Sequence, residues 1–213
     1  MIITAIEEQK KNKERRSIFV DGEFAFGMSV EDVYFYRLKE GLEISEEYFE
    51  EIKTNVIVAD GKNKALKYLS YSAKTKKEML KKLKTYDFSP DIIDEVIAFL
   101  EEHNFINDYD YAEKFAESRR RAGYGEHRIK SELYIKGISG DVIEDVLEKD
   151  DDDDEDETVN TILKLLEKKI KSDTKEEFYE NERQKIYGFL NRRGFGFDDV
   201  KVAIQRYWEE HSL

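Results

Sequence analysis

Positively charged side chains that could bind phosphate or carboxylate groups gather in two stretches of the chain, and an aromatic residue lies within the second. The guanidinium group of arginine offers its donors in a rigid fork that fits both kinds of anion, and an aromatic ring in a basic loop can stack on an exposed nucleobase. The candidate contact residues are Lys74, Lys76 and Lys77 in the first stretch, and Arg119, Arg120, Arg121, Tyr124, Arg128, Lys130 and Lys136 in the second. The lysines, taken singly, also fit an ordinary solvated helix face, whereas the arginine triplet with Tyr124 favours a binding contact.

Catalytic chemistry finds no support in the residue inventory. The three histidines, His103, His127 and His211, are not spaced with one another or with carboxylates as metal ligands require, and the chain has no cysteine. The glycines on either side of Tyr124 do not form a phosphate loop, because they follow a helix-like segment and lack a downstream Lys-Ser/Thr pair. We therefore expect a protein that is not an enzyme and that needs no cofactor or metal.

The composition of the chain is typical of a folded, helical and soluble protein. Among 213 residues there are 13 tyrosines and 13 phenylalanines, which argue against disorder, and a single proline. No apolar segment approaches the roughly 20 residues that span a bilayer, and the N-terminus lacks the apolar run of a signal peptide. We expect a cytoplasmic protein without a membrane partner, and a monomer. The net charge of −13 argues against tight binding to nucleic acid across the whole surface.

An internal repeat begins at residue 62 and organises the rest of the chain. Three segments align at shifts of 50 and then 57 residues, so that the same six positions are apolar in each. These positions are Met79, Leu83, Phe88, Ile93, Val96 and Ile97 in the first repeat, Ile129, Leu133, Ile138, Ile143, Val146 and Leu147 in the second, and Ile186, Leu190, Phe195, Val200, Ala203 and Ile204 in the third. An aspartate, Asp91, Asp141 or Asp198, begins the last helix of each repeat, where a carboxylate is favourable. Each repeat is therefore predicted to contain a helix, a second helix, a turn and a third helix.

The predicted fold is mainly α-helical. We expect an elongated tandem array of three-helix modules, preceded by a small N-terminal antiparallel β-meander with a helix. The predicted boundaries are residues 1–61 for the N-terminal part, 62–106 and 107–149 for the first two repeats, and 150–213 for an acidic linker with the third repeat. The run of eight acidic residues from 150 to 157 is interpreted as a solvated linker rather than a metal site, because it lacks the glycine and the alternating spacing of a calcium loop.

The N-terminal part has a strand-like pattern. Apolar runs flank Asp21-Gly22, a dipeptide typical of two-residue hairpin turns, and a polar turn is expected over residues 9–14, so three antiparallel strands are predicted. A helix that begins after Ser29 is expected to cover the sheet, because so small a sheet is not stable alone. Its covering residues would be Val33, Tyr34, Tyr36 and Leu38. Ser45 is expected to start a further helix, which Gly61 either interrupts or joins to one long helix.

The stretch from residue 104 to residue 138 carries a connected series of short motifs. They are Phe105-Ile106-Asn107-Asp108, Tyr111-Ala112, Gly123-x-Gly125, Arg128-Ile129, Glu132-Leu133 and Lys136-Gly137-Ile138. In this order and spacing they resemble the RecX family of recombination regulators, proteins that bind the RecA recombinase. The resemblance implies tandem three-helix modules after a small N-terminal extension, which is also what the repeat predicts.

The function that this resemblance implies is regulation without catalysis. The protein would bind the RecA filament assembled on single-stranded DNA, suppress its ATP hydrolysis and strand exchange, and limit filament growth or promote disassembly; its binding to single-stranded DNA alone would be weak. Similar modules in a row would let each weak contact strengthen the others. Two alternatives stay open. One is a stand-alone nucleic-acid-binding protein of the helix-turn-helix type, in which Lys130 or Lys136 faces a groove, and the other is a helical scaffold for a different assembly.

Overall fold

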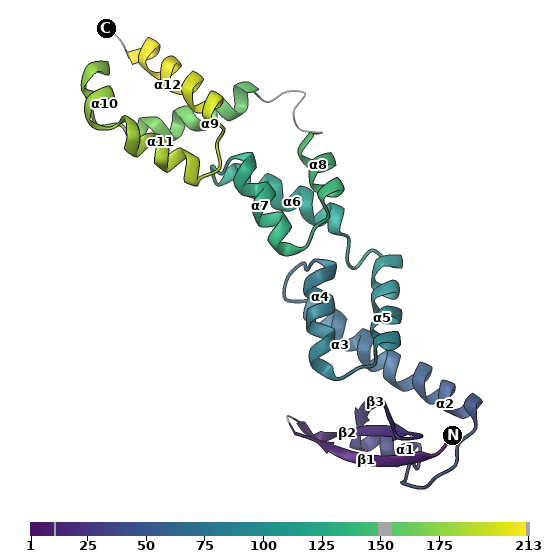
Figure 1. Cartoon of the computed structure of the whole chain (residues 1–213). Coiled ribbons are helices and arrows are strands. Elements are labelled where there is room, and N and C mark those ends of the chain that lie inside the picture. The colour runs from purple at the N-terminus through teal and green to yellow at the C-terminus, as the bar shows by residue number, and fades with distance from the viewer. Residues whose placement is uncertain (11, 149–154, 212–213) are drawn as a thin grey trace. The chain divides into compact units, whose positions relative to one another are not determined.

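The computed structural model describes residues 1–10, 12–148 and 155–211, and the chain divides into two compact units (Figure 1). The first unit is Met1–Asn107, and the second begins at Asp108. Helices dominate both units, and the described strands all lie in the first. The prediction of a mainly helical chain with three-helix repeats after a small antiparallel sheet is confirmed. None of the described helices is both long enough and apolar enough to cross a membrane.

Three strands, β1 (Ile3–Gln9), β2 (Asn12–Val20) and β3 (Glu23–Ser29), form an antiparallel sheet in sequence order. The turn between β2 and β3 is Asp21-Gly22, and both residues have positive φ angles, 51° and 88°, as a type I′ hairpin turn requires. The predicted hairpin is therefore confirmed. The polar turn expected over residues 9–14 is shorter, because β1 and β2 pair beyond their apolar residues through backbone hydrogen bonds that do not depend on side-chain type.

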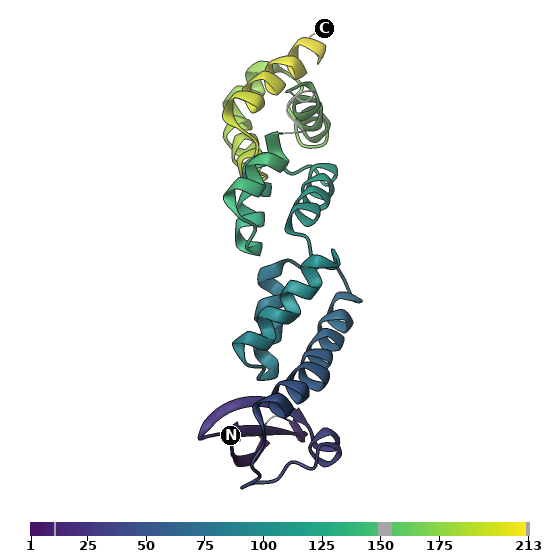
Figure 2. The same cartoon turned by 90° about the vertical axis from the view of Figure 1, so that its right-hand side faces the viewer.

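One long helical run connects the sheet with the first repeat. It consists of α2 (Glu46–Ile52), the π-helical segment η1 (Lys53–Val58) and α3 (Ala59–Leu69). Ser45 caps its start, as predicted, by accepting a hydrogen bond from a backbone amide of the first turn. Figures 1 and 2 show the sheet against the beginning of this run. The expected boundary between residues 61 and 62 falls inside α3.

Two contacts fix the long run against α5 (Pro90–Glu102), the third helix of the first repeat. Gly61 does not interrupt the helix but lies within α3. Glycine allows α5 to approach closely at this position, because a Cβ would lie 2.8 Å from a methyl group of Val96. Lys53 forms an ion pair with Asp91 in the first turn of α5. This pair raises the pKa of Lys53; at Asp91 burial acts to raise the pKa, but the hydrogen bonds from Lys53 and Ser89 outweigh it and lower the pKa.

The helix after Ser29 packs against β2 and β3, and the long run also packs against β3. That helix, α1 (Val30–Phe35), has six residues; Val33 is buried, but Tyr34 is 79% exposed. The expectation that Tyr34 packs on the sheet is wrong, because neighbouring helical residues point about 100° apart and a helix of fewer than two turns buries only a narrow face. Phe49 of α2 contributes the aromatic cover instead, with its ring centroid 5.7 Å from that of Phe26 in β3.

The first repeat is completed by α4 (Lys76–Leu83) and the short 3₁₀ segment η2 (Lys84–Tyr86), which precede α5. Thr75 and Glu78 form a reciprocal capping box at the start of α4. The buried side chains of the sheet, the long helical run, α4 and α5 form a single apolar cluster. The N-terminal sheet and the first repeat therefore share one core.

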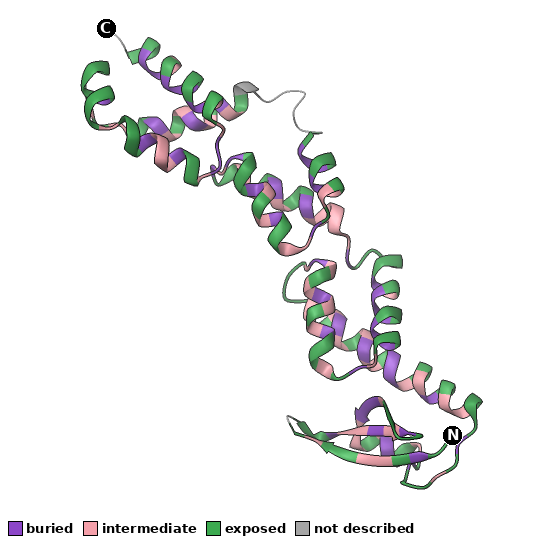
Figure 3. Cartoon of the chain, viewed as in Figure 1, coloured by how far each residue is buried: buried purple, intermediate pink, exposed green. Residues whose placement is uncertain are grey.

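The second unit contains the other two repeats. The second repeat consists of α6 (Asp108–Arg121), α7 (Glu126–Lys136) and α8 (Gly140–Glu148), and the third of α9 (Glu155–Glu167), α10 (Lys175–Asn181), α11 (Arg183–Arg192) and α12 (Phe197–His211). The six aligned apolar positions of every repeat are buried, none with more than 6% exposure (Figure 3). The repeat predicted from the sequence is thus confirmed.

The third repeat contains a helix that the alignment does not predict. Helix α10 lies in the chain between the first and second helices of the repeat, which accounts for the longer shift to this repeat. Phe178 of α10 is fully buried, and its ring centroid lies 5.7 Å from that of Trp208 in α12. Of the acidic run, residues 155–157 begin α9. The interpretation of residues 150–154 as a linker concerns positions outside the described residues.

Candidate partner-binding site

Tyr124 lies in the loop between α6 and α7 with three arginines around its ring. The guanidinium carbons of Arg119, Arg128 and Arg193 are 5.4, 5.9 and 5.2 Å from the ring centroid. Cations at these distances are attracted to the negative face of an aromatic ring. We call Tyr124, these three arginines and Glu132 the Tyr124 cluster. Arg119 comes from the last turn of α6, Arg128 and Glu132 from α7, and Arg193 from the end of α11.

Glu132 holds two of the arginines in place. One of its carboxylate oxygens lies 2.8 Å from Nε of Arg119, and the other accepts a hydrogen bond of 2.7 Å from Nε of Arg128. Burial acts to raise the pKa of the Glu132 carboxyl, but the hydrogen bond from Arg128 and the charges of both arginines outweigh it, so that the pKa lies below its ordinary value. The same hydrogen bond raises the pKa of Arg128, because it stabilises the charged guanidinium group. Glu132 therefore stays ionised and orients both guanidinium groups.

The outer edges of these two guanidinium groups remain available to a partner. The side chains of Arg119 and Arg128 are 37% and 49% exposed, and each uses Nε for Glu132. Three arginines against one carboxylate leave the cluster positively charged. A planar guanidinium that is already oriented loses less side-chain entropy when it binds an anion. The arrangement suits a phosphate or carboxylate next to a planar ring.

Arg193 ties the third repeat to the loop that carries Tyr124. Its Nη1 donates hydrogen bonds to the backbone oxygens of Ala122, at 3.1 Å, and Gly123, at 2.8 Å. In the opposite direction the amide of Gly125 donates to the backbone oxygen of Arg193 at 2.8 Å, and the amide of His127 to that of Gly194 at 3.1 Å. The Tyr124 cluster therefore lies where the second repeat contacts the third.

This contact needs glycine on both sides. A Cβ on Gly125 would lie 2.4 Å from the backbone oxygen of Gly194, and a Cβ on Gly194 would lie 2.3 Å from the backbone nitrogen of Arg128. Gly194 also has a φ of 90°, a conformation that residues with side chains rarely adopt. The Gly123-x-Gly125 motif thus allows the two backbones to approach each other closely.

The other predicted residues of the second repeat are distributed around this cluster. Arg120 is half-buried, whereas Arg121 is exposed and forms an ion pair with Glu117 on its own helix. Nζ of Lys130 lies 3.5 Å from the Glu144 carboxylate of α8. Nζ of Lys136 lies 5.7 Å from the ring centroid of Phe115, a ring that Arg119 also approaches to 4.9 Å. Arg119 and Lys136 are therefore linked through Phe115, and Arg121 and Lys130 have partners of their own.

The predicted lysines of the first repeat belong to the first compact unit. Lys74 donates a hydrogen bond to Ser72, and its Nζ is 5.0 Å from the ring centroid of Tyr68. Lys76 forms an ion pair of 2.7 Å with Glu101 of α5, and Lys77 is exposed. The three lysines therefore do not form one cluster, since Lys74 is held at an aromatic ring and Lys76 by a carboxylate.

Two members of the Tyr124 cluster, Glu132 and Arg193, were not predicted from the sequence as site residues. Glu132 follows Arg128 by one helical turn, a spacing typical of an ion pair, so a signal was present. Arg193 acts on backbone oxygens 70 and 71 residues earlier in the chain, and no local pattern indicates such a contact. Within the described residues, no group of histidines and carboxylates has the arrangement of a metal site.

Four segments that together make up most of the chain match domains of one family. Residues 1–45 match the family described as the regulatory protein RecX N-terminal domain, and residues 62–100, 107–147 and 155–204 match the first, second and third three-helix domains of RecX. The chain belongs to the RecX family. The match also extends over nearly the whole length of related proteins and of a solved structure.

Relatives named regulatory protein RecX align along nearly all of the chain. The protein of Clostridioides difficile strain 630 is 35% identical over 206 residues, which are 96% of this chain and 95% of the relative. That of Bacillus subtilis strain 168 is 34% identical over 212 residues, 99% of this chain and 78% of the relative. These relatives are thus named as regulators.

Two solved RecX structures show the same fold. One, described as the crystal structure of regulatory protein RecX, has a TM-score of 0.61 at 26% identity and covers 96% of this chain and 98% of its own. The other, RecX from Lactobacillus salivarius, has a TM-score of 0.61 at 32% identity and covers 70% of this chain and 96% of its own. The three-helix repeats therefore recur in solved members of the family.

Proposed function

We propose that this protein regulates homologous recombination by binding the RecA filament on single-stranded DNA. It inhibits ATP hydrolysis and strand exchange by the filament, and limits filament growth or promotes disassembly. The full-length match to proteins named regulatory protein RecX carries this proposal. The protein acts in the cytoplasm as a monomer and as a binding partner rather than a catalyst.

The repeated modules support a filament as the partner. A filament presents the same surface at regular intervals, and three similar modules offer it several weak contacts in one chain. Once one module is bound, the others act at a high effective concentration, so that the total affinity exceeds that of any single contact. In the second unit, the Arg193 and glycine contacts hold two of these modules together. Fewer degrees of freedom are then lost on binding.

The Tyr124 cluster is the proposed contact surface of the second unit. Arg119 and Arg128, oriented by Glu132, bind phosphates of the DNA or carboxylates of the recombinase. Arg120, Arg121, Lys130 and Lys136 surround the cluster and add positive charge. Lys74, Lys76 and Lys77 offer separate basic contacts on the first unit. Because the net charge of −13 repels bare DNA, these basic patches are expected to bind a nucleoprotein instead.

The test is DNA-dependent ATP hydrolysis by the cognate recombinase in the presence of sub-stoichiometric protein. The wild type is expected to lower the rate. A triple variant, Arg119→Ala, Arg120→Ala and Arg121→Ala, should need roughly tenfold more protein for half-maximal inhibition, because charged contacts to the partner are lost. Circular dichroism and the fluorescence of Trp208 establish that the variant is folded.

A charge-matched control separates the site from net charge. Lys168, Lys171 and Lys175 are exposed residues of the third repeat, and changing all three to alanine removes the same formal charge. This variant should inhibit like the wild type. If both triple variants need the same concentration for half-maximal inhibition, the Tyr124 cluster has no specific part in the inhibition. No effect of the wild type on ATP hydrolysis, together with strong binding to bare duplex DNA at physiological salt, would favour the stand-alone nucleic-acid-binding protein.

A further inference from the structure

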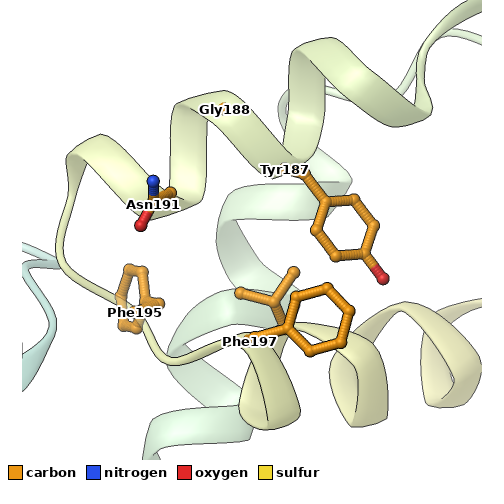
Figure 4. A pocket seen from close by; sticks show the side chains of 6 residues that line it. Tyr187, Gly188, Asn191, Phe195 and Phe197 are labelled. Carbon is orange, nitrogen blue, oxygen red and sulfur yellow. The ribbon is translucent and has the colours of Figure 1, made fainter.

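The third repeat contains a pocket that none of the contacts described above occupies. It has a volume of about 290 Å³ and lies between α11 and the start of α12 (Figure 4). The residues that line it are Tyr187, Gly188, Asn191, Phe195, Phe197 and Val200. In Figure 4, Tyr187 and Phe197 lie at one end of the gap, and Asn191 and Phe195 at the other. The walls are therefore mainly aromatic, with one amide group.

The internal repeat shows why this pocket is open. Residues of the second and third repeats correspond at a shift of 57, so Asn191 takes the position of Tyr134 and Phe197 that of Gly140. In the second repeat the hydroxyl of Tyr134 lies 3.2 Å from where a Cβ of Gly140 would be, so its ring lies across the start of α8. In the third repeat the short side chain of Asn191 leaves this space empty. The second repeat thus carries its ring on the middle helix, at Tyr134, whereas the third repeat carries a ring on the last helix, at Phe197, and only an amide at Asn191.

The aromatic and polar groups around the pocket fit a nucleobase. Phe197 is 64% exposed and offers aromatic surface for stacking. Tyr187, whose ring centroid is 5.6 Å from that of Phe197, has the guanidinium carbon of Arg183 5.6 Å from its own centroid, so a positive charge lies beside the aromatic surface. The amide of Asn191 can both donate and accept hydrogen bonds, as the edge of a base requires. Gly188 leaves room for Arg192, whose Nη1 is 3.4 Å from where a Cβ of Gly188 would lie, so a guanidinium group stands next to the pocket.

The charge of α11 favours a polyanion. Between residues 183 and 193 the chain carries Arg183, Lys185, Arg192 and Arg193 and no acidic residue, within a protein of net charge −13. Asp198 and Asp199 lie in the first turn of α12, on the other wall, so an anionic strand would follow α11. An aromatic side chain of a protein partner would fill the apolar part of the pocket, but it would leave the positive charge of Arg192 beside the pocket without an anionic partner.

We propose that this pocket binds one unstacked base of single-stranded DNA. The base stacks on Tyr187 and Phe197 and forms hydrogen bonds with Asn191, while a neighbouring phosphate binds Arg192. The choice of DNA over RNA rests on the proposed function; the pocket itself needs no recombinase. Binding to bare DNA can therefore be tested separately from inhibition of the filament.

The test compares the wild type with Asn191→Tyr, a variant that places in the third repeat the residue the second repeat already has. The new ring should fill the pocket without a change of charge. Binding of a fluorescein-labelled oligothymidylate at low salt, followed by anisotropy, is expected to weaken roughly fivefold or more, since stacking of one base carries this much affinity. An abasic strand of the same length should bind the wild type and the variant equally.

Two further variants make the outcome unambiguous. Asn181→Tyr makes the same substitution at an exposed position of α10 and should bind like the wild type. Phe197→Ala removes an exposed wall of the pocket and should weaken binding as Asn191→Tyr does. Equal binding of the base-containing strand by the wild type, Asn191→Tyr and Phe197→Ala would overturn the proposal. It would also be overturned if Asn191→Tyr bound DNA normally but lost inhibition of ATP hydrolysis, because the occupant would then be a protein side chain.

Discussion

Replacement of Gly194 by alanine should separate the second and third repeats. Gly194 has a φ of 90°, and a Cβ there would lie 2.3 Å from the backbone nitrogen of Arg128 and 2.4 Å from its Cβ. Ordinary van der Waals contact begins at 3.4 Å, so the two backbones would have to move apart by about 1 Å. Such a shift breaks the hydrogen bonds that the amides of Gly125 and His127 donate across the contact.

The size of the effect follows from these contacts. Alanine in a left-handed conformation costs about 1–2 kcal/mol, and the two lost backbone hydrogen bonds cost about 1 kcal/mol each, so the free energy of unfolding should fall by roughly 3–4 kcal/mol. Gly22→Ala is the matched control, because Gly22 has a φ of 88° and nothing within 4 Å of the added Cβ. This control carries only the conformational cost, so the two variants should differ by about 2 kcal/mol.

Two measurements check this expectation. Urea unfolding is followed by circular dichroism for the whole chain and by the fluorescence of Trp208, the single tryptophan, for the third repeat. Hydrogen exchange measured by NMR reports directly on the amides of Gly125 and His127. Their exchange rates should rise in Gly194→Ala and stay at the wild-type values in Gly22→Ala. Full protection of both amides in Gly194→Ala, or a loss of stability no larger than that of Gly22→Ala, would refute the role assigned to the glycine contact.

Three further substitutions test the charge and capping contacts. Because the pKa of Glu132 is lower in the folded protein than its ordinary value of 4.5, its ion pairs stabilise the fold above that pH and lose their effect as the pH falls through the folded pKa. The stability difference between the wild type and Glu132→Gln, measured by urea unfolding, should therefore be largest near neutral pH and vanish in acid; a constant difference would contradict it. Arg15→Ala should destabilise the first unit by roughly 3 kcal/mol, because Arg15 is buried and bonds to Asp60 at 2.7 Å and to the backbone oxygen of Gly27 at 2.8 Å. The control Arg16→Ala removes an ion pair of 3.8 Å and hydrogen bonds to the nearby backbone oxygens of Lys13 and Arg15, and should cost about 1 kcal/mol, clearly less than Arg15→Ala. Thr75→Ala should lower the melting temperature through loss of the capping box, at a cost of about 1 kcal/mol, and an unchanged melting temperature would show that the cap is dispensable.

Local and periodic signals in the sequence predicted much of the fold. The aligned apolar positions, the Asp21-Gly22 turn and the capping residue Ser45 all depend on neighbours in the chain or on a repeated spacing. Helix α10 was not predicted, because it has no counterpart in the other two repeats with which to align. The exposure of Tyr34 was missed because the length of its helix, rather than its residue type, decides which face is buried.

The candidate site was only partly predictable. Clustering of charge pointed to Arg119, Tyr124 and Arg128, which the structure brings together around one ring. The sequence could not show that Arg193, from another repeat, completes the same cluster, because that contact depends on how two modules pack. Nor could it show that Lys76 is paired with Glu101, since residues distant in sequence meet only in the folded chain.

The single apolar cluster of the first 107 residues has a consequence for work with fragments. A cut between residues 61 and 62 would pass through α3 and expose the apolar interior of both pieces to water, so each piece is expected to aggregate when it is expressed alone. A cut between residues 107 and 108 leaves this cluster whole. Fragment experiments that ask which half of the chain engages the recombinase should therefore divide the protein at that position.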